Sequence, residues 1–371
     1  MDIFFRADAS LTIGHGHVMR CLTLASALRE RGLRSTFVCK EHPGNLCDFI
    51  EDRGFPVVRI PVAGMASFPS TVGHAVWLGS SVIEDAELTR IAIEHAGPRP
   101  QWLIVDHYAI DHEWEIILRS AAYRLMVIDD LADRLHDCDV LLDQNFFFDL
   151  QQRYVDRVPP GCTMLLGPKY ALLQPAYALL HAQAEPKNAV RRIFMFFGGA
   201  DAGNLTGRAI CAFQKLKRPD IWLDVVMTSG SANYEALQKQ VSGHSNICLH
   251  GALPSLGPFM AKADLAIGAG GATVWERLCL GLPSIVISLA ENQKPVCKDL
   301  ASADLIRYLG FQDEADEGLI LSAMSDVIDS KGISEWSRRC YDVCDGEGAS
   351  RVAETILAKP TLFMMSGERD D

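Results

Sequence analysis

Residues 4–20 read FFRADASLTIGHGHVMR, a short apolar strand followed by a glycine-bearing loop and the start of a helix. Glycine carries no Cβ, so a ligand can approach the backbone of such a loop closely. The free amides at a helix start attract anions such as phosphate. His17 stands where the predicted helix begins and is a candidate proton acceptor. This stretch therefore predicts a strand–loop–helix unit in which an anionic ligand lies beside a base.

Strand-like and helix-like segments alternate along the rest of the chain, which is typical of parallel sheets covered by helices on both faces. In the first half we expect strands at 3–5, 35–39, 57–60, 102–105, 125–128 and 140–142, with helices at 18–30, 45–52 and 86–95. A second series begins near Arg191, with strands at 193–197, 223–227, 247–249, 265–267 and 284–288 and a last helix at 350–357. Polar residues follow several strands, at the edge where open α/β sheets bind ligands.

The two series predict an α/β fold of two Rossmann-like domains that face each other across a cleft. We expect an N-terminal domain at 1–176, a C-terminal domain at 189–358 and a tail at 359–371, with a polar linker at 177–188. Residues 61–81 are rich in glycine, serine and proline, and are expected to form a loop or an insertion. The ligand is expected between the domains, because each sheet offers its strand ends to the cleft.

Composition excludes several functional classes. The 371 residues include 35 Lys and Arg against 47 Asp and Glu, a net charge of −12, which disfavours nucleic-acid binding through phosphate contacts. The 11 cysteines are scattered without a CxxC pair, as expected for reduced thiols in a cytoplasmic protein. No apolar run approaches the ~20 residues that span a bilayer, and no secretory signal is visible. We expect a cytoplasmic protein without a membrane segment, and a monomer, since nothing in the sequence demands a dimer.

A second glycine-rich turn, GAGGATVWER at 268–277, joins a predicted strand to a predicted helix. The backbone amides of Gly270, Gly271 and Ala272 can close on a diphosphate, helped by the partial positive charge of the helix start. Thr273 can add a hydroxyl donor or cap the helix. Glu276, one turn further on, can accept hydrogen bonds from ribose hydroxyls. The turn fits neither the GxGxxG fingerprint nor the Walker A loop, and simple helix-on-strand packing is the alternative interpretation.

His17 is the favoured catalytic residue. A helix start disfavours the imidazolium form, so the ring would stay neutral and could accept a proton from an attacking water. Asp8 could orient the ring or the water. Gly14 and Gly16 would make room for the substrate, and His15 lies within the loop rather than at the helix start. An ordinary structural histidine is the alternative for His17.

Three further polar residues are expected at the cleft. Tyr108 follows a buried strand in the run Asp106-His107-Tyr108 and could bind a sugar. Asn292 and Gln293 each offer a donor and an acceptor, suited to sugar or phosphate groups. A half-buried loop aromatic and an ordinary helix cap are the structural alternatives. The histidine spacing predicts no metal site, although His107 and His112 stand beside aspartates.

These motifs resemble those of the UDP-sugar hydrolases of pseudaminic acid biosynthesis, which act on UDP-2,4-diacetamido-2,4,6-trideoxy-β-L-altropyranose. The similarity runs in motif order from about residue 3 to 307. It rests on RADAS (6–10), IGHGH (13–17) with Arg20, DHY (106–108), FGGAD (197–201), GAGGATVWER (268–277), LGLP (280–283) and AENQ (290–293).

The resemblance implies the two-domain glycosyltransferase-B architecture, shared with the lipid-II N-acetylglucosaminyltransferase, and a hydrolysis that needs neither metal nor cofactor. By this resemblance His17 is the general base, water attacks the anomeric carbon with inversion, and UDP leaves. The biological setting would be pseudaminic acid biosynthesis for flagellin glycosylation. The expected UDP contacts are Gly270, Gly271, Ala272, Thr273, Glu276 and Gln293; the expected sugar contacts are Asp8, Gly14, His15, Gly16, Tyr108 and Asn292.

Other functions remain open from sequence alone. A nucleotide-sugar glycosyltransferase of the same fold would use an acceptor hydroxyl in place of water. A non-catalytic protein that binds a nucleotide sugar would release no UDP. A hydrolysing UDP-N-acetylglucosamine 2-epimerase would share the fold, but the motifs fit it less well.

Overall fold

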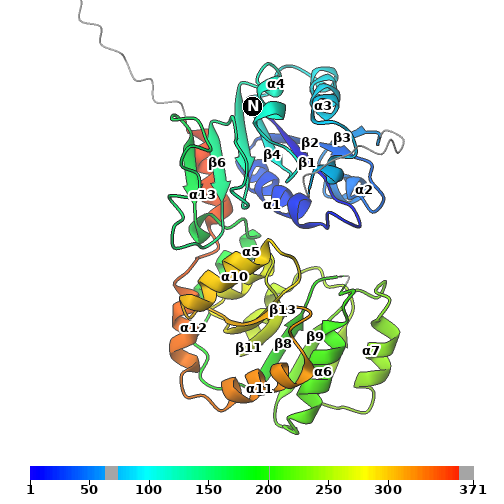
Figure 1. Ribbon diagram of the computed structural model, residues 1–371, viewed down its shortest axis with the longest axis vertical. Coiled ribbons are helices and arrows are strands. Elements are labelled where there is room, and N and C mark those ends of the chain that lie inside the picture. The colour runs from blue at the N-terminus through cyan, green and yellow to red at the C-terminus, as the bar shows by residue number, and fades with distance from the viewer. Residues whose placement is uncertain (63–73, 200, 359–371) are drawn as a thin grey trace, which may run out of the picture.

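The computed structural model describes residues 1–62, 74–199 and 201–358. Its first domain is built on a seven-stranded parallel sheet of order β3-β2-β1-β4-β5-β6-β7 (Figure 1). The strands are β1 (Asp2–Ala7), β2 (Arg34–Lys40), β3 (Val57–Ile60), β4 (Trp102–Asp106), β5 (Arg124–Ile128), β6 (Val140–Asp143) and β7 (Thr163–Leu166). The helical elements are α1 (Gly16–Glu30), α2 (Cys47–Asp52), η1 (Ala75–Leu78), α3 (Val82–Ala96), α4 (His112–Leu118) and η2 (Pro168–Tyr170). Helix α5 (Pro175–Ala182) follows and packs against the second domain.

The second domain is built on a six-stranded parallel sheet of order β10-β9-β8-β11-β12-β13. Its strands are β8 (Arg192–Phe196), β9 (Trp222–Val226), β10 (Ile247–His250), β11 (Leu265–Ala269), β12 (Ser284–Ser288) and β13 (Arg307–Phe311). Its helices are α6 (Leu205–Lys215), α7 (Tyr234–Val241), α8 (Gly257–Lys262), α9 (Thr273–Cys279), α10 (Gln293–Ser302), α11 (Glu317–Ile328) and α12 (Ile333–Tyr341); α13 (Gly348–Leu357) follows.

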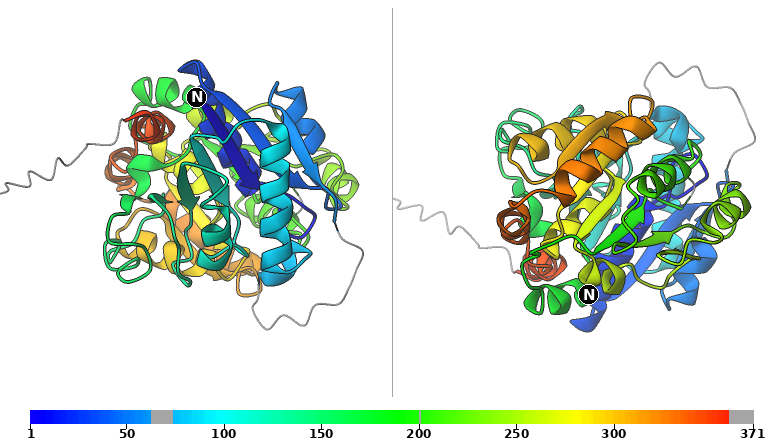
Figure 2. Two further views of the ribbon diagram at one scale, coloured as in Figure 1. Left: turned by 90° about the horizontal axis from the view of Figure 1, so that it is seen from above. Right: turned by 90° about the horizontal axis from the view of Figure 1, so that it is seen from below.

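The predicted fold class is confirmed: two parallel α/β domains stand one above the other, with helices on both faces of each sheet (Figures 1 and 2). The central strands are apolar runs because both of their faces are covered. All five residues of β4 and of β11 are buried, for example. In each sheet the strand order reverses beside the first strand of the domain, and ligands bind outside the strand ends at such a switch point.

The last helix does not follow the predicted domain boundary. Helix α13, expected in the C-terminal domain, buries Ala349, Val352, Ala353 and Ile356 in the core of the first domain, next to α1. The indole Nε1 of Trp102 donates to the carbonyl of Ile356 at 3.1 Å. The chain therefore crosses back, and its C-terminal helix completes the N-terminal domain.

The predicted linker also differs from the structure. Its first part is helical, because Pro175 opens α5 and Tyr177 packs into the second domain against α8 and α9. Within the expected insertion, residues 63–73 lie outside the described residues, and the remainder includes the single turn η1. The tail at 359–371 also lies outside them. Among the helices of the described ranges, none is both long and apolar enough to cross a membrane.

Candidate active site

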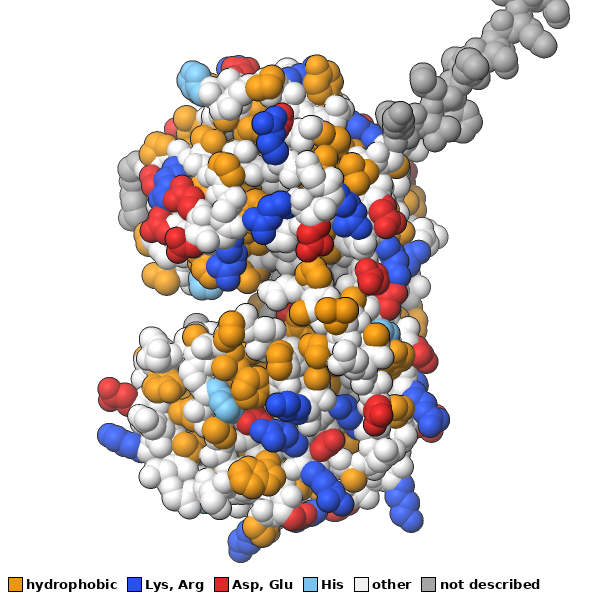
Figure 3. Space-filling model, turned by 180° about the vertical axis from the view of Figure 1, so that it is seen from behind, with side chains coloured by type: hydrophobic (Ala, Val, Ile, Leu, Met, Phe, Trp, Pro, Cys, Tyr) orange, Lys and Arg blue, Asp and Glu red, His pale blue; other side chains and the backbone are white. Residues whose placement is uncertain are grey.

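A cavity of about 320 Å³ opens between the two domains, and both contribute to its walls. Figure 3 shows the molecule hollowed between its two lobes on the face seen there. The N-terminal domain supplies Thr12, Ile13, Gly16, His17, Arg20, Trp77, Tyr108, Asp130, Gln144 and Asn145. The C-terminal domain supplies Gly270, Gly271, Ala272, Trp275, Ala290, Asn292, Gln293 and Val296. Two distant sequence motifs, the histidine loop and the glycine-rich turn, thus face one space.

His17 is held by a carboxylate at the end of a central strand. In the first turn of α1 its Nδ1 lies 2.5 Å from Asp106 Oδ1, at the end of β4. A carboxylate only accepts, so Nδ1 carries the hydrogen and Nε2 is left as the basic nitrogen. Among the described residues, none forms a hydrogen bond with Nε2.

Arg20 keeps that carboxylate ionised. Its Nε donates to Asp106 Oδ2 at 2.5 Å and its Nη2 donates to Oδ1 at 2.7 Å. Burial alone would raise the pKa of Asp106, but the charge of Arg20 and the hydrogen bonds from Arg20 and His17 outweigh it and hold the pKa well below its ordinary value. The Asp106 carboxylate can therefore orient His17 and stabilise positive charge on the ring when it takes a proton.

Tyr108 links the histidine to the opposite domain. Its ring meets the His17 ring edge-on, with the centroids 4.5 Å apart. Its hydroxyl donates to Asp130 Oδ1 at 2.6 Å and accepts from Asn292 Nδ2, across the cleft, at 3.3 Å. Asn292 precedes α10, yet its side chain makes no capping hydrogen bond to that helix. The structure thus brings Tyr108 and Asn292, two of the six predicted sugar contacts, to the cavity and connects them.

The glycine-rich turn presents backbone donors. In the described part of the chain, the amides of Gly271, Ala272 and Thr273 donate to no backbone or side-chain acceptor. Gln293 Oε1 accepts from the Leu289 amide at 2.9 Å, which leaves its NH₂ group as a donor beside the turn. A Cβ on Gly268 would lie 2.4 Å from the Phe196 carbonyl oxygen, so only glycine permits this close packing. Free amides grouped in this way suit a diphosphate.

Two of the expected UDP contacts stand behind that turn. Neither Thr273 nor Glu276 belongs to the cavity wall. The Glu276 carboxyl lies against the Tyr177 hydroxyl, and its Oε2 is buried with no partner among the described residues. Burial raises the pKa of Glu276 to about 7, against the opposing effects of Tyr177 and Arg277.

Asp8 does not reach the cavity, in contrast to its expected contact with substrate. It is fully buried: its Oδ1 accepts from Arg6 Nη1 at 2.6 Å and from the Lys40 amide at 2.7 Å. Orientation of His17 falls to Asp106 instead. Asp8 instead anchors the start of the loop to the end of the neighbouring strand β2.

Of the other residues of the histidine loop that were expected to contact the sugar, only one reaches the cavity. Gly16 lines the cavity, whereas Gly14 and His15 are exposed and lie outside its wall. Gly14 adopts a left-handed backbone conformation with φ of 80°, which favours glycine and accounts for that residue without a ligand contact.

Several cavity residues are not among the site residues predicted from sequence. Asp106 and Asp130 lie at strand ends, where the sequence indicates only a position facing the cleft for the run 106–108, and a divalent ion or a helix cap for 129–130. Gln144 and Asn145 follow β6. Their position after predicted parallel strands was the available signal, because carboxyl ends of such strands gather at one edge. Trp77, from the segment predicted as a loop, carried no such signal.

For a reaction in which His17 accepts the proton, we expect Asp106→Asn to lower kcat by about 10²–10⁴-fold, because an amide no longer secures the tautomer with basic Nε2. KM should change little, since Asp106 is buried beneath the histidine. Steady-state kinetics across pH measure both effects. Asp133→Asn is the control, because Asp133 is exposed, pairs with Arg134 and lies outside the cavity wall. Equal losses in the two variants would contradict the positioning role of Asp106.

Comparisons with known proteins bear on the fold and on the second domain. Residues 192–316 match the family model of the glycosyltransferase family 28 C-terminal domain. The chain is 24% identical over 302 residues to the UDP-2,4-diacetamido-2,4,6-trideoxy-beta-L-altropyranose hydrolase of Campylobacter jejuni, covering 81% of this chain and 96% of that protein. It is 27% identical over 194 residues to the spore coat polysaccharide biosynthesis protein SpsG of Bacillus subtilis. That match spans 51% of this chain and 57% of SpsG.

Among solved structures, MurG from Acinetobacter baumannii superposes with a TM-score of 0.67. The superposition covers 96% of this chain and 99% of MurG at 14% sequence identity, so it speaks for the fold alone. The protein has the glycosyltransferase-B fold, and its second domain carries the match to the glycosyltransferase family 28 C-terminal domain.

Proposed function

We propose that the protein is a hydrolase that releases UDP from UDP-2,4-diacetamido-2,4,6-trideoxy-β-L-altropyranose or a close stereoisomer. The observation that carries the proposal is the shared cavity. A histidine–carboxylate pair stands on one wall and a turn of free backbone amides on the other. A base and an anion site on opposite sides of one space suit the displacement of a diphosphate by water.

In the reaction we propose, His17 Nε2 removes a proton from water while the water oxygen attacks the anomeric carbon. The bond between that carbon and the β-phosphate oxygen breaks, and UDP leaves with the electron pair. Amides of Gly271 and Ala272 stabilise the charge that develops on the diphosphate, without any reorganisation at the moment of reaction. Attack from the side opposite to UDP inverts the anomeric configuration.

The sugar itself is proposed from similarity. The sequence motifs resemble those of hydrolases acting on this diacetamido sugar, and the Campylobacter relative carries that activity in its name. Tyr108 and Asn292 lie beside the proposed base, where acetamido groups and ring hydroxyls could contact them. By the same similarity we propose a place in pseudaminic acid biosynthesis, and hence in flagellin glycosylation.

A panel assay tests the proposal. The protein is incubated with UDP-linked diacetamido-trideoxy sugars that differ in ring stereochemistry, and free UDP and free sugar are followed by NMR. We expect stoichiometric release of both from one member of the panel in the absence of any acceptor. Binding of the panel without release of UDP would identify a non-catalytic protein and would contradict the proposal.

A glycosyltransferase is the second candidate, because the second domain matches a glycosyltransferase family model and the fold is that of MurG. It would transfer the sugar to an acceptor hydroxyl. The panel assay separates the two functions: a transferase releases UDP slowly until an acceptor is added, whereas a hydrolase is indifferent to it.

The raised pKa of Glu276 predicts a pH-dependent affinity. Below about pH 7 the carboxyl is mostly protonated, and above it the carboxylate accepts hydrogen bonds from ribose hydroxyls more strongly. Affinity for the UDP-sugar should therefore rise as the pH goes from 6 to 8. Calorimetry on the His17→Asn variant measures binding without turnover, and the diphosphate diester of a UDP-sugar does not titrate in this range. In the double variant His17→Asn/Glu276→Gln, the affinity should no longer change between pH 6 and 8. An affinity that still rises as in His17→Asn would contradict a contact between Glu276 and UDP.

A further inference from the structure

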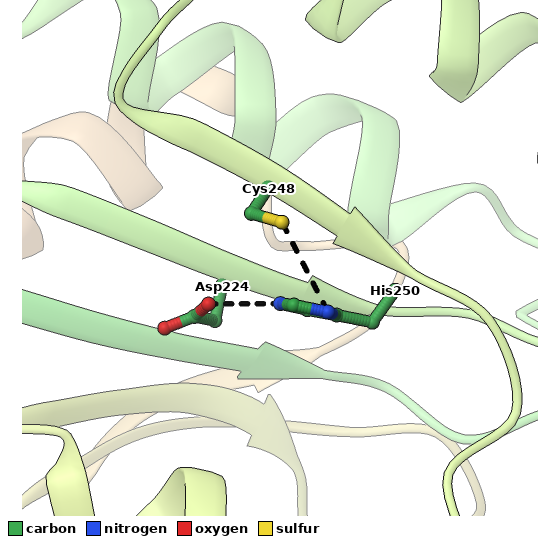
Figure 4. A group of neighbouring side chains, drawn as sticks. All are labelled: Asp224, Cys248 and His250. Atoms are coloured by element: carbon green, nitrogen blue, oxygen red, sulfur yellow. Dashed lines mark hydrogen bonds and ion pairs between the residues drawn. The ribbon is translucent and has the colours of Figure 1, made fainter.

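A second group of chemically active side chains lies on the sheet of the C-terminal domain, outside the cavity wall. Cys248 and His250 are two residues apart on β10, an edge strand, so their side chains share one face. Asp224 on β9 stands opposite Cys248 in the strand register. Figure 4 shows the thiol and the carboxylate both turned toward the imidazole ring. Parallel register thus assembles a cysteine, a histidine and an aspartate at one point.

The distances in this cluster suit a small cation. His250 Nε2 lies 2.8 Å from Asp224 Oδ1, and His250 Nδ1 lies 3.9 Å from Cys248 Sγ. One ligand atom from each of the three residues falls within 4.8 Å of the others. Tetrahedral zinc, with bonds of about 2.0–2.3 Å, holds its ligand atoms roughly 3.2–3.7 Å apart. The two contacts involve opposite ring nitrogens, so a shared cation requires the thiol or the imidazole to rotate, and Cys248 on the edge strand is exposed.

We propose that Asp224, Cys248 and His250 form a binding site for a zinc-type divalent cation, with water as the fourth ligand. Thiolate and imidazole select zinc-like metals over magnesium or calcium, which prefer all-oxygen sites. On binding, the thiol loses its proton to solvent, and the hydrogen on the metal-bound nitrogen of His250 moves to the other ring nitrogen. The metal would tie the edge strand β10 to β9, and so stabilise the second domain.

Arg192 is the competitor for this site. Its guanidinium donates to both oxygens of Asp224, from Nε at 2.5 Å and from Nη2 at 3.0 Å. The pKa of Asp224 is lowered by Arg192 and His250 against the opposing effect of burial, so the carboxylate is available in its charged form. A cation must displace the guanidinium or share the carboxylate with it. Replacement of Arg192 should therefore increase the affinity for the metal. If the cluster were only a structural ion pair, the same replacement would create no metal binding.

Cobalt(II) titration of the full-length reduced protein tests the site. Cobalt bound to a thiolate gives a charge-transfer band in the near ultraviolet, so the signal reports Cys248 directly. We expect one equivalent to bind, with the affinity at least about tenfold weaker in His250→Ala and Asp224→Asn, and the band to vanish in Cys248→Ser. Arg192→Gln should bind more tightly, whereas Arg191→Gln, its exposed neighbour, should match the wild type.

Cys211→Ser is the matched thiol control, because Cys211 is half-buried on α6 of the same domain and lies outside the cluster. Zinc should also raise the Tm of the wild type and not of Cys248→Ser. A missing charge-transfer band, or a band that survives Cys248→Ser, would overturn the proposal. The readouts are binding and stability, so they do not depend on the hydrolase activity.

Discussion

His17→Asn is expected to lower the rate of UDP release by about 10²–10⁴-fold, the usual contribution of a general base. Asparagine is close in size to the proximal part of the imidazole and can still accept a hydrogen bond, but it cannot take the proton of the attacking water. UDP should bind nearly as tightly as in the wild type, because its proposed site lies on the other domain. Turnover is measured by coupled release of UDP, and affinity by calorimetry.

His15→Asn is the matched control for this prediction. His15 lies two residues earlier in the same loop, is exposed and makes no side-chain capping bond to α1. Its replacement should leave turnover close to that of the wild type, and so decide between the two histidines of the motif. Near-normal hydrolysis by His17→Asn would contradict the assignment of His17 as the general base.

Asp85→Ala is expected to destabilise the protein by about 3–5 kcal/mol, the typical cost of leaving a buried charge without its partner. Asp85 on α3 is fully buried, and its Oδ2 lies 2.8 Å from both Arg6 Nη2 and Lys40 Nζ. Asp8 is the second carboxylate of this cluster, so two cations and two anions balance. Removing Asp85 leaves one excess positive charge in the interior. Against a total stability of roughly 5–15 kcal/mol, such a loss is severe.

Urea denaturation measures the effect, and Glu87→Ala on the same helix is the control. Glu87 forms an ion pair with Arg90 at the surface, so its loss should leave the free energy of unfolding nearly unchanged. The direction of the shift in the pKa of Asp85 also predicts how the stability of the protein depends on pH. Burial would raise that pKa, but Arg6 and Lys40 hold it below 3.8, so this stabilisation is present at neutral pH and is lost as the medium becomes acidic. Equal stability of the two variants would contradict the buried-charge account.

Local pattern was sufficient to predict most of the fold. The buried strands were recognisable as continuous apolar runs, and strands 102–105 and 265–267 lie within β4 and β11. The sequence does not predict the edge strands β7 and β13, because both are only partly buried, β7 has just three apolar residues in a row, and a glycine interrupts β13. Helix α13 was placed in the wrong domain, since an apolar helix face does not say which sheet it will cover.

The candidate site was predictable where glycine and strand-end polar residues mark it. The histidine loop and the turn at Gly270–Ala272 do meet at one cavity. The roles of individual side chains depend on contacts that local sequence cannot reveal. His17 and Asp106 are 89 residues apart, and they meet because β1 and β4 are neighbours with Ala7 opposite Asp106. From sequence alone Asp8 is expected to be exposed, because charged side chains are rarely buried without a partner. Its partners, Arg6 and the Lys40 amide, are known only from the structure.

Hydrolysis in water enriched in ¹⁸O is the most direct test of attack by water on the anomeric carbon. The account predicts that the label appears on C1 of the released sugar, that UDP carries none, and that the first anomer detected by NMR has the inverted configuration. Label in the β-phosphate of UDP, or a first product with retained configuration, would contradict it.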